Sequence, residues 1–141
     1  MLWKLVSLKI HLPPSPASLM EDPYEWMMEP KKWLILTLLA HTGLGVIGNA
    51  SAYEGDIDEV LATVGFLSLI SVFLVYAAFI SEGREQARLA AVICGPVFVW
   101  FLVCMALDLE FLANTFTISE IAPALMIWGM PALVGVLNWN D

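Results

Sequence analysis

Four long apolar runs, separated by short charged segments, dominate the hydropathy pattern of this 141-residue chain. Each run holds close to the ~20 residues that a helix needs to cross ~30 Å of hydrocarbon. Because short connections join antiparallel neighbours, the pattern predicts an all-α fold, namely a polytopic membrane protein with four transmembrane helices in an antiparallel up-down bundle. The expected spans are approximately residues 33–51, 60–80, 89–107 and 118–137.

These limits also predict the domain organisation. Residues 1–32 form an N-terminal segment, residues 33–137 the four-helix transmembrane domain, and residues 138–141 a short tail. The beginning of the N-terminal segment has three interpretations. It is an interfacial anchor, or a weak secretory signal whose apolar run Lys9 and His11 interrupt, or extra sequence before a true start at Met20.

Composition supports the membrane assignment and excludes one class of partner. The chain is 60% hydrophobic and 14% charged, with a mean hydropathy of +0.79, whereas soluble domains carry about 25% charged residues. The formal net charge of -8 disfavours nucleic acid, since an acidic surface repels a phosphate backbone. The expected partner is therefore the lipid bilayer, with no nucleic acid.

The basic residues are distributed unevenly along the chain. All six lie in the N-terminal segment or in the second connection, which two crossings place on the same side of the membrane. The positive-inside rule assigns that side to the cytoplasm. The sequence thus predicts both termini inside, in the cell membrane, and the compact loops favour a prokaryotic plasma membrane. The six residues are Lys4, Lys9, Lys31, Lys32, Arg84 and Arg88.

Arg84 and Arg88 lie one helical turn apart at the inner entrance of the third span. Topology determination explains this pair. Binding of an anionic lipid head group, or of an acidic loop of a partner, is the functional alternative.

The first and third connections and the start of the fourth span form a predicted outer acidic face without basic residues. Negative charge stabilises helix N-termini, and a solvated charged face is the favoured interpretation. An outer mouth that concentrates cations is the alternative. The spacing does not fit an EF-hand loop, so no metal site is expected. The seven carboxylates are Glu54, Asp56, Asp58, Glu59, Asp108, Glu110 and Glu120.

Small residues recur at spacings of three and four along the first two spans, which places them on one stripe of each helix. Such stripes let helix backbones approach closely in lipid, where no hydrophobic drive holds helices together. The first two spans are therefore expected to pack on each other. The predicted helix-packing residues are Gly45 and Gly48 on the first span, and Gly65, Ser68 and Ser71 on the second.

His41 is the main ionisable side chain inside the predicted spans, and Thr37 and Asn49 are further polar candidates on the same span. An intramembrane ionisable group is costly and by default suggests a function. A neutral His41 hydrogen-bonded to a neighbouring helix explains it without chemistry and is the favoured interpretation, with a proton relay or a ligand contact as alternatives. One chain does not supply two axial haem ligands at membrane depth, because His11 lies outside the spans. No cofactor is expected.

No HExxH, GxSxG or Glu-x-x-His motif occurs, so no catalytic residue is assigned and a non-enzymatic role is favoured. The leading hypothesis is an accessory or assembly subunit, or a homo-oligomer, that acts through helix contacts. The alternative is a small proton or cation transporter or channel using His41, the acidic outer face and kinks expected at Pro96 and Pro123. A weaker alternative is a binder or enzyme for a lipid-soluble molecule.

Overall fold

The computed structural model describes residues 23–52, 54–109 and 118–141, and these residues form helices and short turns, without strands. A short helix, α1 (Pro23–Met27), precedes the first long helix. That helix is continuous but changes type along its length, from α to π and back to α. The long helices are α2 (Pro30–Ala40) with η2 (His41–Gly48) and α3 (Asn49–Ala52), α4 (Ile57–Val75) with η3 (Tyr76–Ile80), α5 (Gly83–Ala106), and α6 (Ile118–Leu137).

Four of these helical units are long and apolar enough to cross a membrane, which confirms the predicted number of spans. They cover Pro30–Ala52, Ile57–Ile80, Gly83–Ala106 and Ile118–Leu137. The first three begin before the limits expected from hydropathy, because polar residues at the edge of each apolar run continue the helix. The predicted all-helical fold is confirmed for the residues that the structure describes.

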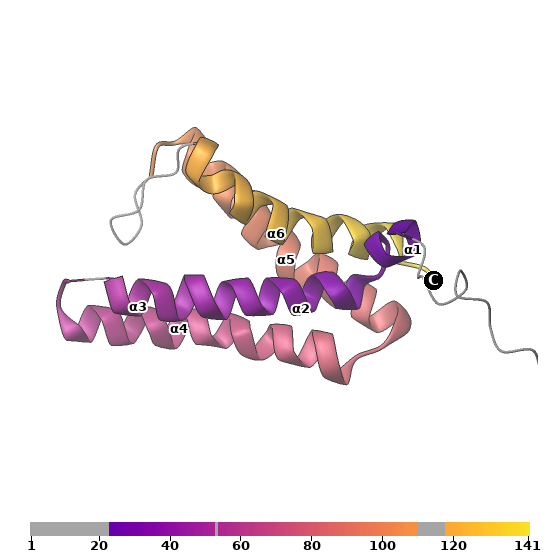
Figure 1. Ribbon diagram of the computed structural model, residues 1–141, viewed down its shortest axis with the longest axis horizontal. Helices are drawn as coiled ribbons and strands as arrows, with labels where there is room; N and C mark the ends of the chain where they lie inside the picture. The colour runs from indigo at the N-terminus through magenta and orange to yellow at the C-terminus, as the bar shows by residue number, and fades with distance from the viewer. Residues whose placement is uncertain (1–22, 53, 110–117) are drawn as a thin grey trace, which may run out of the picture.

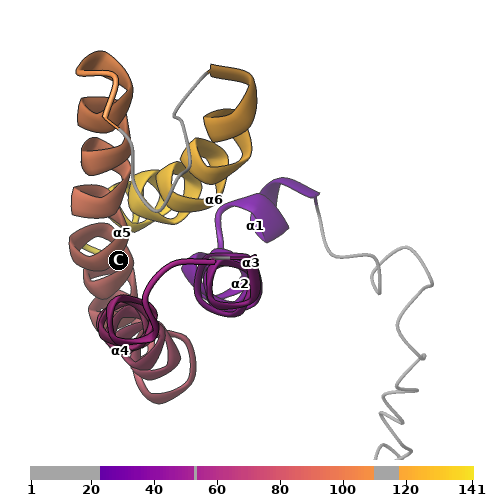
Figure 2. The same cartoon turned by 90° about the vertical axis from the view of Figure 1, so that its left-hand side faces the viewer.

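The four long helices form two antiparallel hairpins (Figure 1). The first hairpin pairs α2, η2 and α3 with α4 and η3, and the second pairs α5 with α6. The hairpins meet at one end of the molecule, where α2 contacts α5 and α6, and diverge toward the other end (Figures 1 and 2). We call the closed end, which carries Arg84 and Arg88, the basic end, and the open end, which carries Asp56 and Asp108, the acidic end.

The buried core lies in the half of the molecule next to the basic end. Its residues come from all four long helices and include aliphatic side chains and one tryptophan. Large apolar side chains are exposed in both halves, such as Leu44 and Phe66 in the acidic half and Phe79 in the basic half, as is expected where lipid takes the place of water. The core cluster consists of Leu34, Leu74, Ala77, Ala78, Ala90, Cys94 and Trp128.

The closest packing of two helices joins α5 to α6. A Cβ atom added at Gly135 of α6 would lie 2.7 Å from the Ala91 nitrogen of α5, and closer still to the Ala87 carbonyl oxygen. Only a residue without a side chain fits this approach. This contact was not predicted, because the predicted helix-packing residues all lie on the first two spans. The observed contact joins a glycine of α6 to alanines of α5.

Side-chain amides close the basic end. The Gln86 amide donates to the carbonyl oxygens of Ala77, Ala78 and Ser81, at 2.9, 3.2 and 3.0 Å, and so caps the last turn of η3. These carbonyls would otherwise lack partners where the helix ends. The turn between the hairpins is thereby held by one buried glutamine.

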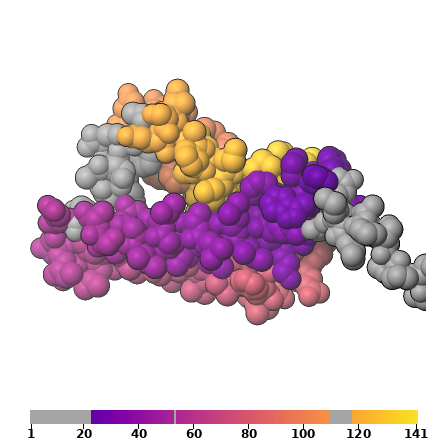
Figure 3. Space-filling view, viewed as in Figure 1, coloured from indigo at the N-terminus to yellow at the C-terminus, as the bar shows by residue number. Residues whose placement is uncertain are grey.

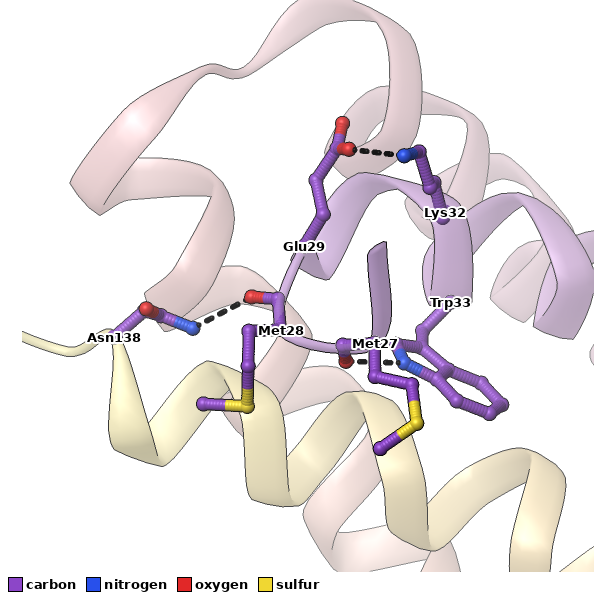
Figure 4. A network of polar contacts seen from close by, with 6 residues as sticks. All are labelled: Met27, Met28, Glu29, Lys32, Trp33 and Asn138. Atoms are coloured by element: carbon purple, nitrogen blue, oxygen red, sulfur yellow. Dashed lines mark hydrogen bonds and ion pairs between the residues drawn. The ribbon is translucent and has the colours of Figure 1, made fainter. Parts of the chain in front are cut away.

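The segment before α2 is attached to the end of α6. The Asn138 amide donates to the Met28 carbonyl oxygen at 3.0 Å, and Trp33 Nε1 donates to the Met27 carbonyl oxygen at 2.8 Å (Figure 4). Both bonds satisfy backbone groups in the short turn between α1 and α2. The first and last described helices therefore meet at the basic end.

Candidate functional site

His41 lies at the point where the two hairpins separate. It is the first residue of η2, and its side chain is 8% exposed. Its Nε2 lies 3.0 Å from the Leu67 carbonyl oxygen of α4, and its ring meets the Trp128 ring of α6 edge to face, with centroids 5.3 Å apart. A carbonyl oxygen only accepts, so Nε2 carries a proton, and in the neutral ring Nδ1 is an acceptor.

Thr37 forms a second link one helical turn before His41. Its side chain is completely buried, and its Oγ1 donates to the Ile127 carbonyl oxygen of α6 at 2.8 Å. Next to His41, Thr42 Oγ1 and Ser71 Oγ lie 2.9 Å apart and join η2 to α4. Polar contacts of Thr37, His41 and Thr42 thus connect the first span to α6 and to α4.

The π-helical geometry of η2 changes which residues share a face with His41. Hydrogen bonds in a π-helix join residues five apart rather than four, and Val46 is buried while Gly45 is only half-buried. Beyond His41, the buried face of the first span therefore continues at Val46 and not at Gly45, where α-helical spacing would place it. The third polar candidate, Asn49, donates through Nδ2 to the Gly45 carbonyl oxygen at 2.7 Å, within its own helix.

The predicted helix-packing residues occupy different environments. Ser71 bonds to Thr42 across the first hairpin, whereas Ser68 Oγ donates to the Val64 carbonyl oxygen of its own helix at 2.7 Å. Gly65 is exposed, and a Cβ atom there would meet nothing within 4 Å. The tight approach within the chain is at Gly135 instead, and packing of Gly65 against another helix stays a prediction.

The other two glycines of the stripe make contacts within their own helix. A Cβ atom at Gly45 would lie 3.1 Å from His41 Nδ1, and one at Gly48 would lie 3.5 Å from the Gly43 carbonyl oxygen. Gly45 therefore lies next to the His41 side chain and not at a contact between two helices.

The acidic candidates lie at the open end of the molecule. Asp56 accepts from the Asp58 backbone nitrogen at 2.8 Å and so caps the N-terminus of α4, and Glu120 lies in the first turn of α6. Among the described residues, no three or more His, Cys, Asp or Glu side chains gather as a metal site would require. Glu110 lies outside the described residues. The candidates Glu54, Asp56, Asp58, Glu59, Asp108 and Glu120 are all exposed.

Arg84 and Arg88 donate hydrogen bonds to backbone carbonyl groups that follow α6. Arg84 Nη2 donates to the Asn140 carbonyl oxygen at 3.0 Å, and Arg88 Nε donates to the Trp139 carbonyl oxygen at 3.2 Å. The Arg88 guanidinium also lies 5.4 Å from the centre of the Trp139 ring, within the range of a cation–π contact. Both arginines remain exposed, so lipid binding is still compatible with these contacts.

Sequence reasoning missed three partners in the site: the Leu67 and Ile127 carbonyl groups and the Trp128 ring. Backbone carbonyls carry no residue-specific signal, and only tertiary packing selects the two that are used. Trp128 had a signal, because it is an aromatic residue in the middle of an apolar run rather than at a membrane interface.

Between His41 and the basic end lie fully buried side chains, most of them apolar, including Leu34, Leu74 and Cys94, together with the hydroxyl group of Thr37. No protein family, curated protein or solved structure matches this chain.

Proposed function

We propose that this multi-pass membrane protein is an accessory or assembly subunit, which binds a transmembrane helix of a partner through the acidic half of its first hairpin. The observation that carries the proposal is the separation of the hairpins beyond His41. In this half, η2 and α3 pack mainly against α4, while α5 and α6 lean away (Figures 1 and 2). One side of the first hairpin is thereby left without a neighbouring helix of the chain.

The surface of α4 in this half suits a second helix. Gly65 has no atom within 4 Å of the place where a Cβ would be, and the adjacent Leu61 and Phe66 are 61% and 67% exposed. A small residue between large apolar neighbours forms a shallow depression, in which another backbone gains van der Waals contact. Packing of this kind, rather than hydrophobic drive, holds helices together in lipid.

Charge favours a different protein over a second copy. The described part of the acidic end carries six carboxylates and no lysine or arginine. Two copies associated through this half would bring like charges together, whereas a partner with basic loops would gain attraction, which salt would screen. We therefore infer a heteromeric complex.

Gly65→Leu tests the proposal, because it adds a large side chain at an exposed position where a Cβ atom meets nothing within 4 Å. We expect the tagged variant to retain about tenfold less partner than wild type, which corresponds to a loss of about 1.4 kcal/mol of binding free energy. The measurement is purification from native membranes in mild detergent, followed by native mass spectrometry of the complex.

Gly95→Leu is the matched control, since a Cβ at this glycine of α5 also meets nothing within 4 Å. It is expected to keep the wild-type amount of partner. An undiminished complex in Gly65→Leu contradicts the proposal. A species made only of two identical chains would show that a second copy, and not another protein, covers this surface.

A further inference from the structure

One ring nitrogen of His41 has no hydrogen-bond partner among the residues that the structure describes. Nε2 is occupied by the Leu67 carbonyl oxygen, while Nδ1 bonds to no described residue. Every fully buried side-chain nitrogen or oxygen among the described residues has a partner. Nδ1 is therefore not fully buried, and it belongs to the 8% of the side chain that remains exposed.

Gly45 keeps the approach to this nitrogen open. A Cβ atom at position 45 would lie 3.1 Å from Nδ1, closer than nearly all real Cβ contacts. The ring has little room to move aside, because the Leu67 carbonyl oxygen and the Trp128 ring hold it on other sides. A glycine at this position thus leaves free space beside the one unbonded acceptor.

His41 contacts both hairpins, through the Leu67 carbonyl oxygen of α4 and the Trp128 ring of α6. The rest of η2 packs mainly against α4 and its own helix. The space-filling view shows a hollow between the first hairpin and α6, toward the acidic end (Figure 3). Since the hollow opens between spans, a molecule dissolved in the bilayer is expected to enter it from the side.

The chemistry of the site selects one class of occupant. An acceptor held in apolar surroundings without a partner costs free energy, and a hydroxyl group supplies the missing donor. The neighbouring wall is the Trp128 ring, which favours an apolar or aromatic body. π-Helical segments such as η2 are frequent at functional sites, and here the π-helix contains both His41 and Gly45.

We propose that His41, Gly45 and Trp128 form a binding site for a lipid-soluble molecule with a hydroxyl group, such as a long-chain phenol. The hydroxyl donates to His41 Nδ1, while the apolar body lies in the gap between the hairpins. The two proposals are tested at different residues, since a Cβ atom at Gly65 would meet no atom of His41 within 4 Å.

A pair of probes tests the hydrogen bond. The protein is labelled isotopically at histidine and carries His11→Gln, which leaves His41 as its single histidine. Para-nonylphenol is expected to shift the Nδ1 resonance in the nitrogen NMR spectrum in a saturable manner. Para-nonylanisole has the same apolar body without the hydroxyl donor and should leave the resonance in place. The absence of a shift with the phenol, or an equal shift with both, overturns the proposal.

A pair of glycine variants tests the position of the site. Gly45→Ala places a methyl group beside Nδ1, and the phenol should bind about tenfold more weakly. Gly43→Ala adds the same group to the same helix where nothing lies within 4 Å, and binding should not change. Equal affinity of the two variants would contradict the assignment, and neither result depends on whether Gly65→Leu loses a partner protein.

Discussion

A few polar side chains inside the apolar spans set the contacts between helices. Thr37, His41 and Thr42 occupy less than two turns of the first span, yet they bond to α6 and to α4. In an apolar medium a polar group without a partner is costly, so each such bond restricts how the helices pack. These residues explain why the first span contacts both α4 and α6 near its middle.

Thr37→Val is expected to weaken the attachment of α2 to α6. The substitution keeps the shape of the fully buried side chain but removes the donor to the Ile127 carbonyl oxygen. We expect the free energy of unfolding to fall by about 0.6 kcal/mol, the average for interhelical hydrogen bonds in membranes, and by no more than about 1.7 kcal/mol, their maximum. Reversible unfolding in mixed detergent micelles measures this change.

Thr63→Val is the control, because Thr63 is a half-buried threonine of α4 for which the structure shows no hydrogen bond to another helix. The free energy of unfolding of the Thr63→Val variant should stay within about 0.5 kcal/mol of the wild-type value. An equal loss in both variants would mean that the Thr37 bond does not hold the hairpins together.

At the scale of helices, the second hairpin is packed tightly and the first is packed through polar contacts. Gly135 brings α6 onto the alanine face of α5, whereas η2 and α4 meet through Thr42 and Ser71. Both strategies are typical of helices in lipid, which associate through small residues or hydrogen bonds. The difference explains why the second hairpin behaves as one unit from which the first diverges.

Gly135→Ala is expected to force α5 and α6 apart. The new methyl group would overlap the backbone of Ala87 and Ala91, and overpacking of this kind costs about 1–3 kcal/mol. Gly95→Ala, where a Cβ meets nothing within 4 Å, should instead be neutral or stabilising by about 0.5–1 kcal/mol, because alanine favours a helix. Unfolding of the two variants in parallel measures the contrast, and equal stability would rule out the tight contact.

At the scale of the whole molecule, charge and packing are both asymmetric along the helix axes. The described lysines and arginines lie at the end where the hairpins close, and the opposite, open end carries carboxylates alone. The positive-inside rule then predicts that the open end faces outward. In that orientation, the proposed partner helix and the lipid-soluble ligand both act in the outer half of the bilayer.

Cysteine labelling tests this orientation. Gly55→Cys lies at the acidic end and Glu82→Cys at the basic end, and both positions are exposed. A membrane-impermeant maleimide applied to intact cells should label Gly55→Cys at once, and Glu82→Cys only after permeabilisation. The native Cys94 and Cys104 are buried and should contribute little background. The reverse labelling pattern would invert the predicted topology.

The sequence by itself determined the number of spans, their approximate limits and the absence of strands from the described chain, because bilayer thickness imposes length and hydropathy on every crossing segment. His41 stood out for the same reason, as an ionisable group in an apolar run. Hydropathy is a property of each segment alone, so it contains no information about which faces of two segments meet.

Only the tertiary structure decided how the spans pack. The tight contact at Gly135, the backbone partners of Thr37 and His41, and the gap between the hairpins all depend on residues distant in sequence. The π-helical turn after His41 moved Val46 into the buried stripe in place of Gly45, a shift that α-helical spacing does not contain. Packing and backbone geometry, which local patterns do not encode, thus leave one ring nitrogen of His41 without a partner among the described residues.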